Sequence, residues 1–110
     1  TRFEWVALED SLQWSAFQRL VNLLRDRGNE VVVLVGPFNE HMMAEANSAA
    51  FRKLRDGVTA WLAGQRVPHV VPDALPSALY ADASHPLTED YRLLAQRLCA
   101  DASLSAWVKH

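Results

Sequence analysis

The chain of 110 residues has a single cysteine, four glycines and no large excess of either charge. One cysteine excludes a disulfide scaffold and a metal site made of several thiolates. No apolar run approaches the roughly 20 residues that a membrane-spanning helix needs. The formal net charge of −2 provides no basic field to attract nucleic acid or an anionic membrane.

Hydrophobic residues, in contrast, are plentiful. They make up 50% of the chain, against 22% charged residues, and this balance excludes an intrinsically disordered chain. The length fits one small domain or part of a larger one. The sequence starts at Thr1 without a secretory pattern, which we interpret as a processed or excised piece.

Helical and strand patterns alternate along the chain. Apolar spacing predicts helices over residues 11–27, 43–63 and 88–98, with Ser11 and Thr88 as N-caps and Gly28 as a left-handed cap. The packed face of the last helix should hold Tyr91, Leu94, Ala95, Leu98. Ser103 should cap a short terminal turn that reaches Trp107. Short apolar runs predict strands at 31–35 and 67–71, and a weaker one at 3–8.

The run Val31–Val35 is the clearest strand. All five residues are apolar and four are β-branched, which favours a strand buried on both faces. Strands alternating with helices predict an α/β fold with a short parallel sheet. Two or three strands are fewer than the usual four to six or so. We therefore expect an incomplete domain, or a sheet that another chain completes.

An acid and a histidine lie three residues apart in a turn-rich segment. Asp82 and His85 stand before the last helix and beyond the end of a predicted strand, where ligands bind in open α/β sheets. A carboxylate here can accept a hydrogen bond from the Nδ1–H of the imidazole. That bond leaves Nε2 free to take a proton from a nucleophile.

This segment, Asp82-Ala83-Ser84-His85-Pro86 followed by Leu87 to Ala95, resembles the last block of the SGNH (GDSL-type) esterase and acylhydrolase superfamily. The preceding order of strand, helix, strand and loop also fits, so the resemblance covers residues 31–98. Two positions depart from the pattern: Asp90, where many members carry Gly, and Leu87, where Asn is frequent.

The resemblance implies a three-layer α/β/α sandwich, of which this chain is the C-terminal part. It implies Asp82 as the residue that orients His85, and His85 as the general base. The serine nucleophile would lie upstream of Thr1, so this piece alone should not hydrolyse esters. The implied substrate is a small-molecule or carbohydrate ester, with no cofactor and no metal. The piece would associate with the rest of its own domain or form a homo-oligomer.

A second alignment places the whole site within the chain. Glu9-Asp10-Ser11-Leu12 differs by one residue from a Gly-Asp-Ser-Leu turn, and Gly36 and Asn39 follow a predicted strand. Ser11, Asn39, Asp82 and His85 would then form a compressed set. Glu9 opposes this alignment because the tight turn favours the conformational freedom of Gly.

Other functions compete with an esterase. A non-catalytic α/β module could associate through its incomplete sheet edge. A nucleotide-binding unit ranks last, because Gly36 lacks the companion glycines of a phosphate loop. Asp82 and His85 could also be a structural pair. The remaining candidate residues have simpler structural interpretations: a surface pair or group for Glu40, His41 and Glu45, a satisfied histidine for His69, and packing for Cys99 and the four tryptophans.

Overall fold

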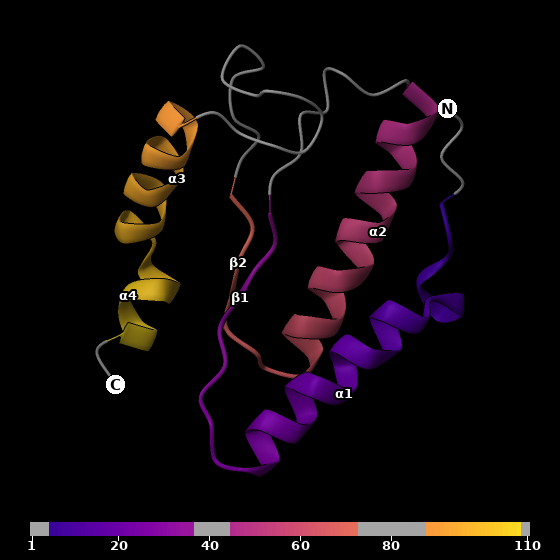
Figure 1. Cartoon of the computed structure of the whole chain (residues 1–110), viewed down its shortest axis with the longest axis horizontal. Coiled ribbons are helices and arrows are strands. Elements are labelled where there is room, and N and C mark those ends of the chain that lie inside the picture. The colour runs from indigo at the N-terminus through magenta and orange to yellow at the C-terminus, as the bar shows by residue number, and fades with distance from the viewer. Residues whose placement is uncertain (1–4, 37–44, 73–87, 109–110) are drawn as a thin grey trace.

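The computed structural model describes residues 5–36, 45–72 and 88–108. Helices and strands alternate along these residues (Figure 1), which confirms an α/β composition. The elements are η1 (Leu8–Asp10), α1 (Leu12–Asp26), β1 (Val33–Leu34), α2 (Glu45–Gly64), β2 (His69–Val70), α3 (Thr88–Ala100) and α4 (Ala102–Val108).

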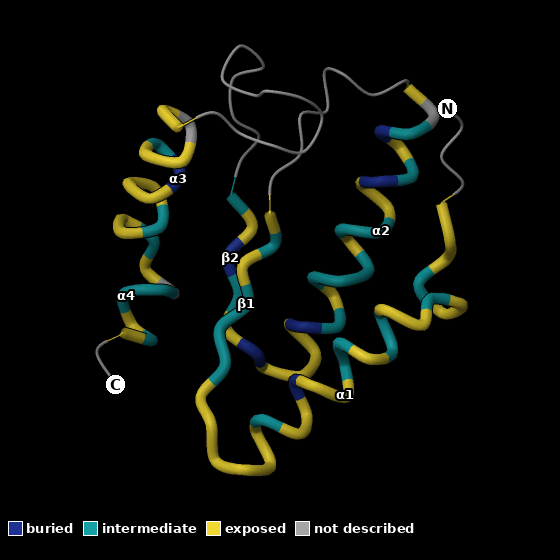
Figure 2. The backbone as a smooth tube through the Cα atoms, in the orientation of Figure 1, coloured by how far each residue is buried: buried dark blue, intermediate teal, exposed yellow. Residues whose placement is uncertain are grey.

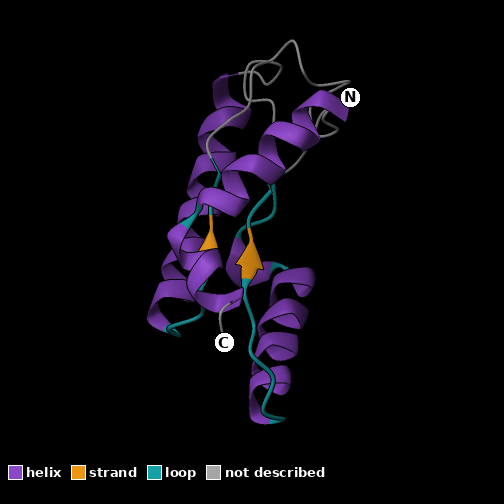
Figure 3. Cartoon of the chain, turned by 90° about the vertical axis from the view of Figure 1, so that its left-hand side faces the viewer, coloured by secondary structure: helices purple, strands orange, loops and turns teal. Residues whose placement is uncertain are grey.

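The two strands form a parallel sheet, as the sequence predicts. Val33 pairs with His69 and Leu34 with Val70. The Val33 N–H donates to the Pro68 carbonyl at 2.9 Å, and the Val35 N–H donates to the Val70 carbonyl at 2.9 Å. Helices lie on both sides of the sheet, α1 and α2 on one side and α3 and α4 on the other (Figures 1 and 3). Because the strands are parallel, their carboxyl ends lie at the same end of the sheet, which we call its carboxyl edge.

The main hydrophobic core lies between α1, α2 and one face of β1. Its fully buried residues are Val21, Leu62 and Val67, each no more than 2% exposed. Partly buried residues packed around them are Phe17, Val31, Val33, Val35, Val58 and Trp61. A smaller cluster on α3 surrounds Leu94. Outside these clusters, the buried residues of the described chain are Ser48 and Phe51 on α2 and Val70 on β2 (Figure 2).

Aromatic rings join α1 to α2 beside this core. Trp14 stacks on Phe17 with ring centroids 5.6 Å apart and meets Trp61 edge-on at 5.4 Å. With the Gln18 amide turned so that its oxygen faces the two indoles, that oxygen accepts from Trp14 Nε1 at 3.2 Å and from Trp61 Nε1 at 3.1 Å. Two of the four tryptophans thus serve the packing of these helices, as predicted.

The prediction that Val31–Val35 is buried on both faces is wrong. Val33 and Val35 pack into the core, but Leu34, which points to the other face, is 47% exposed. On that face α4 packs against β2. Among the described residues β1 has no strand neighbour other than β2, so its other edge has no strand beside it.

The first helix begins and ends as its sequence predicts. The Ser11 hydroxyl accepts a hydrogen bond from the Trp14 N–H at 3.1 Å and caps α1. Gly28 adopts φ = 85°. The Gly28 N–H then donates to the Arg25 carbonyl, and the Asn29 N–H donates to the Leu24 carbonyl, each at 2.9 Å. This pair of bonds is the Schellman motif that a left-handed residue permits.

The second helix ends at Gly64, but its left-handed residue is Arg66, with φ = 56°. The Arg66 N–H donates to the Ala63 carbonyl at 3.1 Å, and the Val67 N–H donates to the Leu62 carbonyl at 2.9 Å. Leu62 and Val67 are both buried. Their contact is the apolar pairing that accompanies a Schellman motif, and it holds a non-glycine residue in an unfavourable conformation.

The predicted strand at 3–8 is wrong over its described part. Residues 5–7 are irregular and Leu8 begins η1. Trp5 lies 6.4 Å from the Phe51 ring, and Leu8 packs so closely on Gly57 that an added Cβ there would lie 2.6 Å from Leu8 Cδ1. These contacts with α2 direct the segment onto a helix rather than into the sheet.

The last two helices differ from prediction in their caps and exposures. Thr88 is the first helical residue of α3 rather than its cap. Asp101, not Ser103, caps α4, because its carboxylate accepts from the Leu104 N–H at 3.2 Å. Leu94 is buried and Leu98 packs beside it, but Tyr91 is 54% exposed. Cys99 is exposed, so the separate prediction that it packs is wrong. Ala95 is exposed as well. Only part of the predicted face therefore packs.

We expect Arg66→Gly to raise the free energy of unfolding by about 0.5–1 kcal/mol, because glycine removes the left-handed strain. Gly28→Ala should lower the free energy of unfolding by about 1 kcal/mol, because alanine is strained at the positive φ of Gly28. Urea denaturation measures both changes.

Gly64→Ala is the control for a glycine that is not in the left-handed region. Gly64 is helical, and a Cβ there would meet nothing within 4 Å. Alanine should stabilise the helix by about 0.5–1 kcal/mol. A loss of stability in Arg66→Gly would contradict the assigned backbone strain.

Candidate functional site

The predicted catalytic residues Asp82 and His85 lie outside the described residues. The flanking elements, however, have defined positions. β2 ends at Val70 and α3 begins at Thr88. The segment that carries both residues therefore connects the carboxyl end of a parallel strand to the start of a helix, which is the position where open α/β sheets bind ligands.

A small pocket lies at this carboxyl end of β2. It has a volume of about 290 Å³. Its lining comes from the end of β2 and from the junction of α3 and α4: Val70, Val71, Pro72, Arg97, Leu98, Asp101. The pocket thus offers apolar walls with one guanidinium and one carboxylate, beside the residue at which the segment of Asp82 and His85 departs.

The structure assigns Ser11 a structural role at the start of α1. Ser11 follows η1 rather than a strand, and its hydroxyl binds the first turn of the helix. A nucleophilic serine would need a strand-to-helix turn that exposes its Oγ. Asn39, the other member of the compressed set, lies outside the described residues. The observed N-cap therefore favours the alignment in which Ser11 is not the nucleophile.

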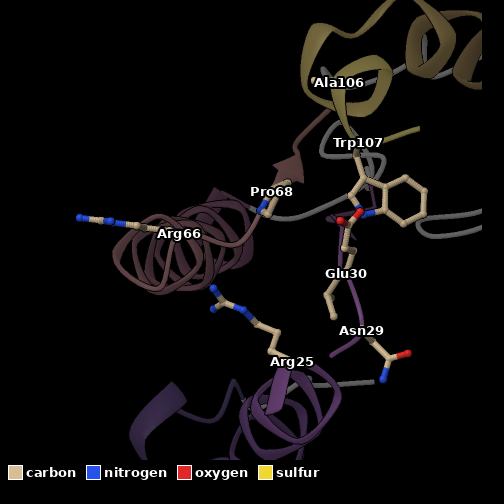
Figure 4. A pocket seen from close by; sticks show the side chains of 8 residues that line it. Arg25, Asn29, Glu30, Arg66, Pro68, Ala106 and Trp107 are labelled. Atoms are coloured by element: carbon tan, nitrogen blue, oxygen red, sulfur yellow. The ribbon is translucent and has the colours of Figure 1, made fainter. Parts of the chain in front are cut away.

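A larger pocket, of about 490 Å³, lies at the opposite end of the sheet (Figure 4). The ends of α1, α2 and α4 surround it, and its lining is Arg25, Asn29, Glu30, Val31, Arg66, Pro68, Ala106, Trp107. The sequence does not predict this pocket, because its residues are dispersed along the chain and form no motif.

One polar side chain of this pocket, Arg25, joins the end of α1 to the end of α2. Arg25 Nη1 donates to the Gln65 carbonyl at 2.7 Å and so places a positive charge at the negative end of the α2 dipole. Glu30 and Trp107 point toward one another across the pocket, while Arg66 points away (Figure 4). Trp107 Nε1 is buried and has no hydrogen-bond partner among the described residues.

Among the described residues, the remaining candidates do not form a catalytic or metal-binding group. His69 Nδ1 lies 2.8 Å from the Val67 carbonyl oxygen. A carbonyl oxygen only accepts, so Nδ1 carries the proton, and the prediction of a satisfied structural histidine is confirmed. Glu45 begins α2 and is exposed, while Glu40 and His41 lie outside the described residues. Within the described ranges no three His, Cys, Asp or Glu side chains cluster as metal ligands would.

No protein-family model matches the chain. Neither the curated proteins nor the solved structures contain a match to it. Over the part of the chain that the structure describes, no helix is both long and apolar enough to cross a membrane.

Arg25→Ala is expected to lower the free energy of unfolding by about 1 kcal/mol, because it removes a charge-assisted hydrogen bond at an exposed site. Arg27→Ala is the control: Arg27 is exposed two residues later, and its loss should change stability by less than about 0.5 kcal/mol. Equal effects in urea denaturation would show that the Gln65 contact adds nothing.

Proposed function

We propose that this chain carries the acid–histidine part of an SGNH-type serine esterase site that acts on O-acyl esters. The observation that supports the proposal is the placement of the Asp82-x-x-His85-Pro86 block. It follows a strand, β2, that pairs in parallel with β1, and it immediately precedes α3. The block thus has the sequence of the family motif and the chain context that this motif requires.

In this proposal the two residues divide the work of a catalytic triad. Asp82 accepts a hydrogen bond from His85 Nδ1–H and orients the ring. His85 Nε2 takes the proton from a serine Oγ as that oxygen attacks the ester carbonyl, and then gives the proton to the departing alcohol. Water, deprotonated by the same nitrogen, hydrolyses the acyl-enzyme and releases the acid and the free serine.

The proposal includes a larger fold than the described sheet. In a three-layer α/β/α sandwich, further strands would pair with the free edge of β1, a helical layer would cover Leu34, and the serine would be supplied from upstream of Thr1. Two features support it: helices lie on both sides of the two-stranded sheet, and β1 has a free edge within the described residues. The substrate class, a small-molecule or carbohydrate ester, follows from the resemblance alone.

In the full-length protein, His85→Ala should reduce hydrolysis of p-nitrophenyl acetate by about 10³-fold or more, because no other base accepts the serine proton. Asp82→Asn should cause a loss of similar order. Ser84→Ala, in the same segment, should retain activity. Circular dichroism checks that each variant folds. Undiminished turnover in folded His85→Ala would overturn the proposal.

The second candidate is a non-catalytic module that associates through its sheet edge. The exposure of Leu34 favours it, since an apolar side chain on an edge strand invites a covering partner. Leu34→Asp should then weaken self-association through the sheet in sedimentation velocity, whereas Val108→Asp, at a side chain 65% exposed on α4, should not. A full-length protein that hydrolyses esters as a monomer would exclude this candidate.

A further inference from the structure

Helix α1 has an apolar side that is wider than the part packed into the core. Its inner side packs into the core through Phe17 and Val21. Its outer side carries four exposed apolar residues, which we name the outer stripe: Leu12, Ala16, Leu20 and Leu23. The three leucines are 83%, 51% and 47% exposed, respectively. A surface helix of a self-sufficient domain buries its apolar side, so the exposed outer stripe requires another explanation.

The stripe is continuous rather than scattered. At about 100° per residue, its four members fall within an arc of roughly 80° on the helix surface. They are spaced four, four and three residues apart, so each is a neighbour of the next on that surface. Contiguous exposed apolar surface of this kind marks an interaction site.

We propose that two copies of this chain associate through their outer stripes, with the two α1 helices antiparallel. The stripe is self-complementary in that arrangement, because its residue spacing is nearly the same in both directions along the helix. In one register Leu12 faces the partner's Leu23, and Ala16 faces the partner's Leu20. The small Ala16 opposite a leucine lets the two helices approach closely. A two-fold axis then relates identical surfaces, as in most dimers.

The charges near the stripe favour the same orientation. Glu9 and Asp10 precede α1, whereas Arg27 follows its last residue. Antiparallel pairing brings Arg27 near the partner's Glu9 and sets the two helix dipoles in opposite directions. A parallel pair would instead bring like charges together at each end. Arg19, which flanks the stripe, approaches its own copy near the two-fold axis and weakens the pair.

The expected dimer is weak. A helix of 15 residues is roughly 22 Å long, so the paired stripes bury less area than a standard interface. We expect a dissociation constant of about 10–100 µM, which lies in the range of transient association. This dimer is independent of the proposed esterase function, because the outer stripe lies on α1 and not at the carboxyl edge of the sheet.

Sedimentation equilibrium of this chain, from about 5 to about 500 µM, should show a monomer–dimer equilibrium. Leu23→Glu should weaken the dimer by at least tenfold, because it places a charge in the apolar contact. Asn22→Glu is the matched control: it adds the same charge at the next residue, which is exposed and off the stripe, and should have little effect. Arg19→Ala should tighten the dimer several-fold.

A cross-linking experiment tests the orientation without depending on a charged substitution. In a Cys99→Ser background, copies with Leu12→Cys and copies with Leu23→Cys are mixed and oxidised by air with a copper–phenanthroline catalyst. The antiparallel register predicts the mixed disulfide as the main product, and self-linked products as minor ones. A monomer at every concentration, a dimer unaffected by Leu23→Glu, or mainly self-linked products would each overturn the proposal.

Discussion

The contact between Leu62 and Val67 governs how the rest of the chain is arranged. Both side chains are buried with Val21 of α1, and the Val67 N–H binds the Leu62 carbonyl. Burial thus ends α2 and fixes the direction in which the chain leaves it. Pairing with β1 begins directly after Val67, through the Pro68 carbonyl, and continues through the Val70 carbonyl. The parallel sheet, and hence the position of its carboxyl edge, depends on this helix end.

The first helix contributes to this core and remains incompletely covered. Trp14 and Phe17 join it to Trp61 of α2, while the leucines of its outer stripe are exposed. The strand β1 shows the same division, because Val33 is packed and Leu34 is exposed. Both features place uncovered apolar surface on α1 and β1, the two elements that form the main core with α2. Association with other polypeptide is therefore a common element of the catalytic and non-catalytic interpretations.

Local signals predicted the fold where a single side chain decides the outcome. Ser11 caps α1 and Gly28 ends it, because a hydroxyl acceptor and a residue without Cβ act over one turn. Sequence patterns predicted less well where distant contacts decide. Arg66 adopts the left-handed conformation because Leu62 and Val67 on either side of it are buried. The exposure of Leu34 was not predicted, because an apolar run does not specify which element covers each face of a strand. The roles of Asp82 and His85 rest on a motif and its position between two elements, so they stay predictions.

The attachment of α3 and α4 has a consequence for the motion of the protein. These helices meet the rest of the described chain mainly where α4 packs on β2, and their own cluster contains one buried residue, Leu94. Little buried apolar surface becomes exposed when these helices separate from the sheet. Their amide hydrogens should therefore exchange with solvent before those of α1 and α2. The start of α3, three residues after His85 in the sequence, therefore belongs to the layer that we expect to open first among the described helices.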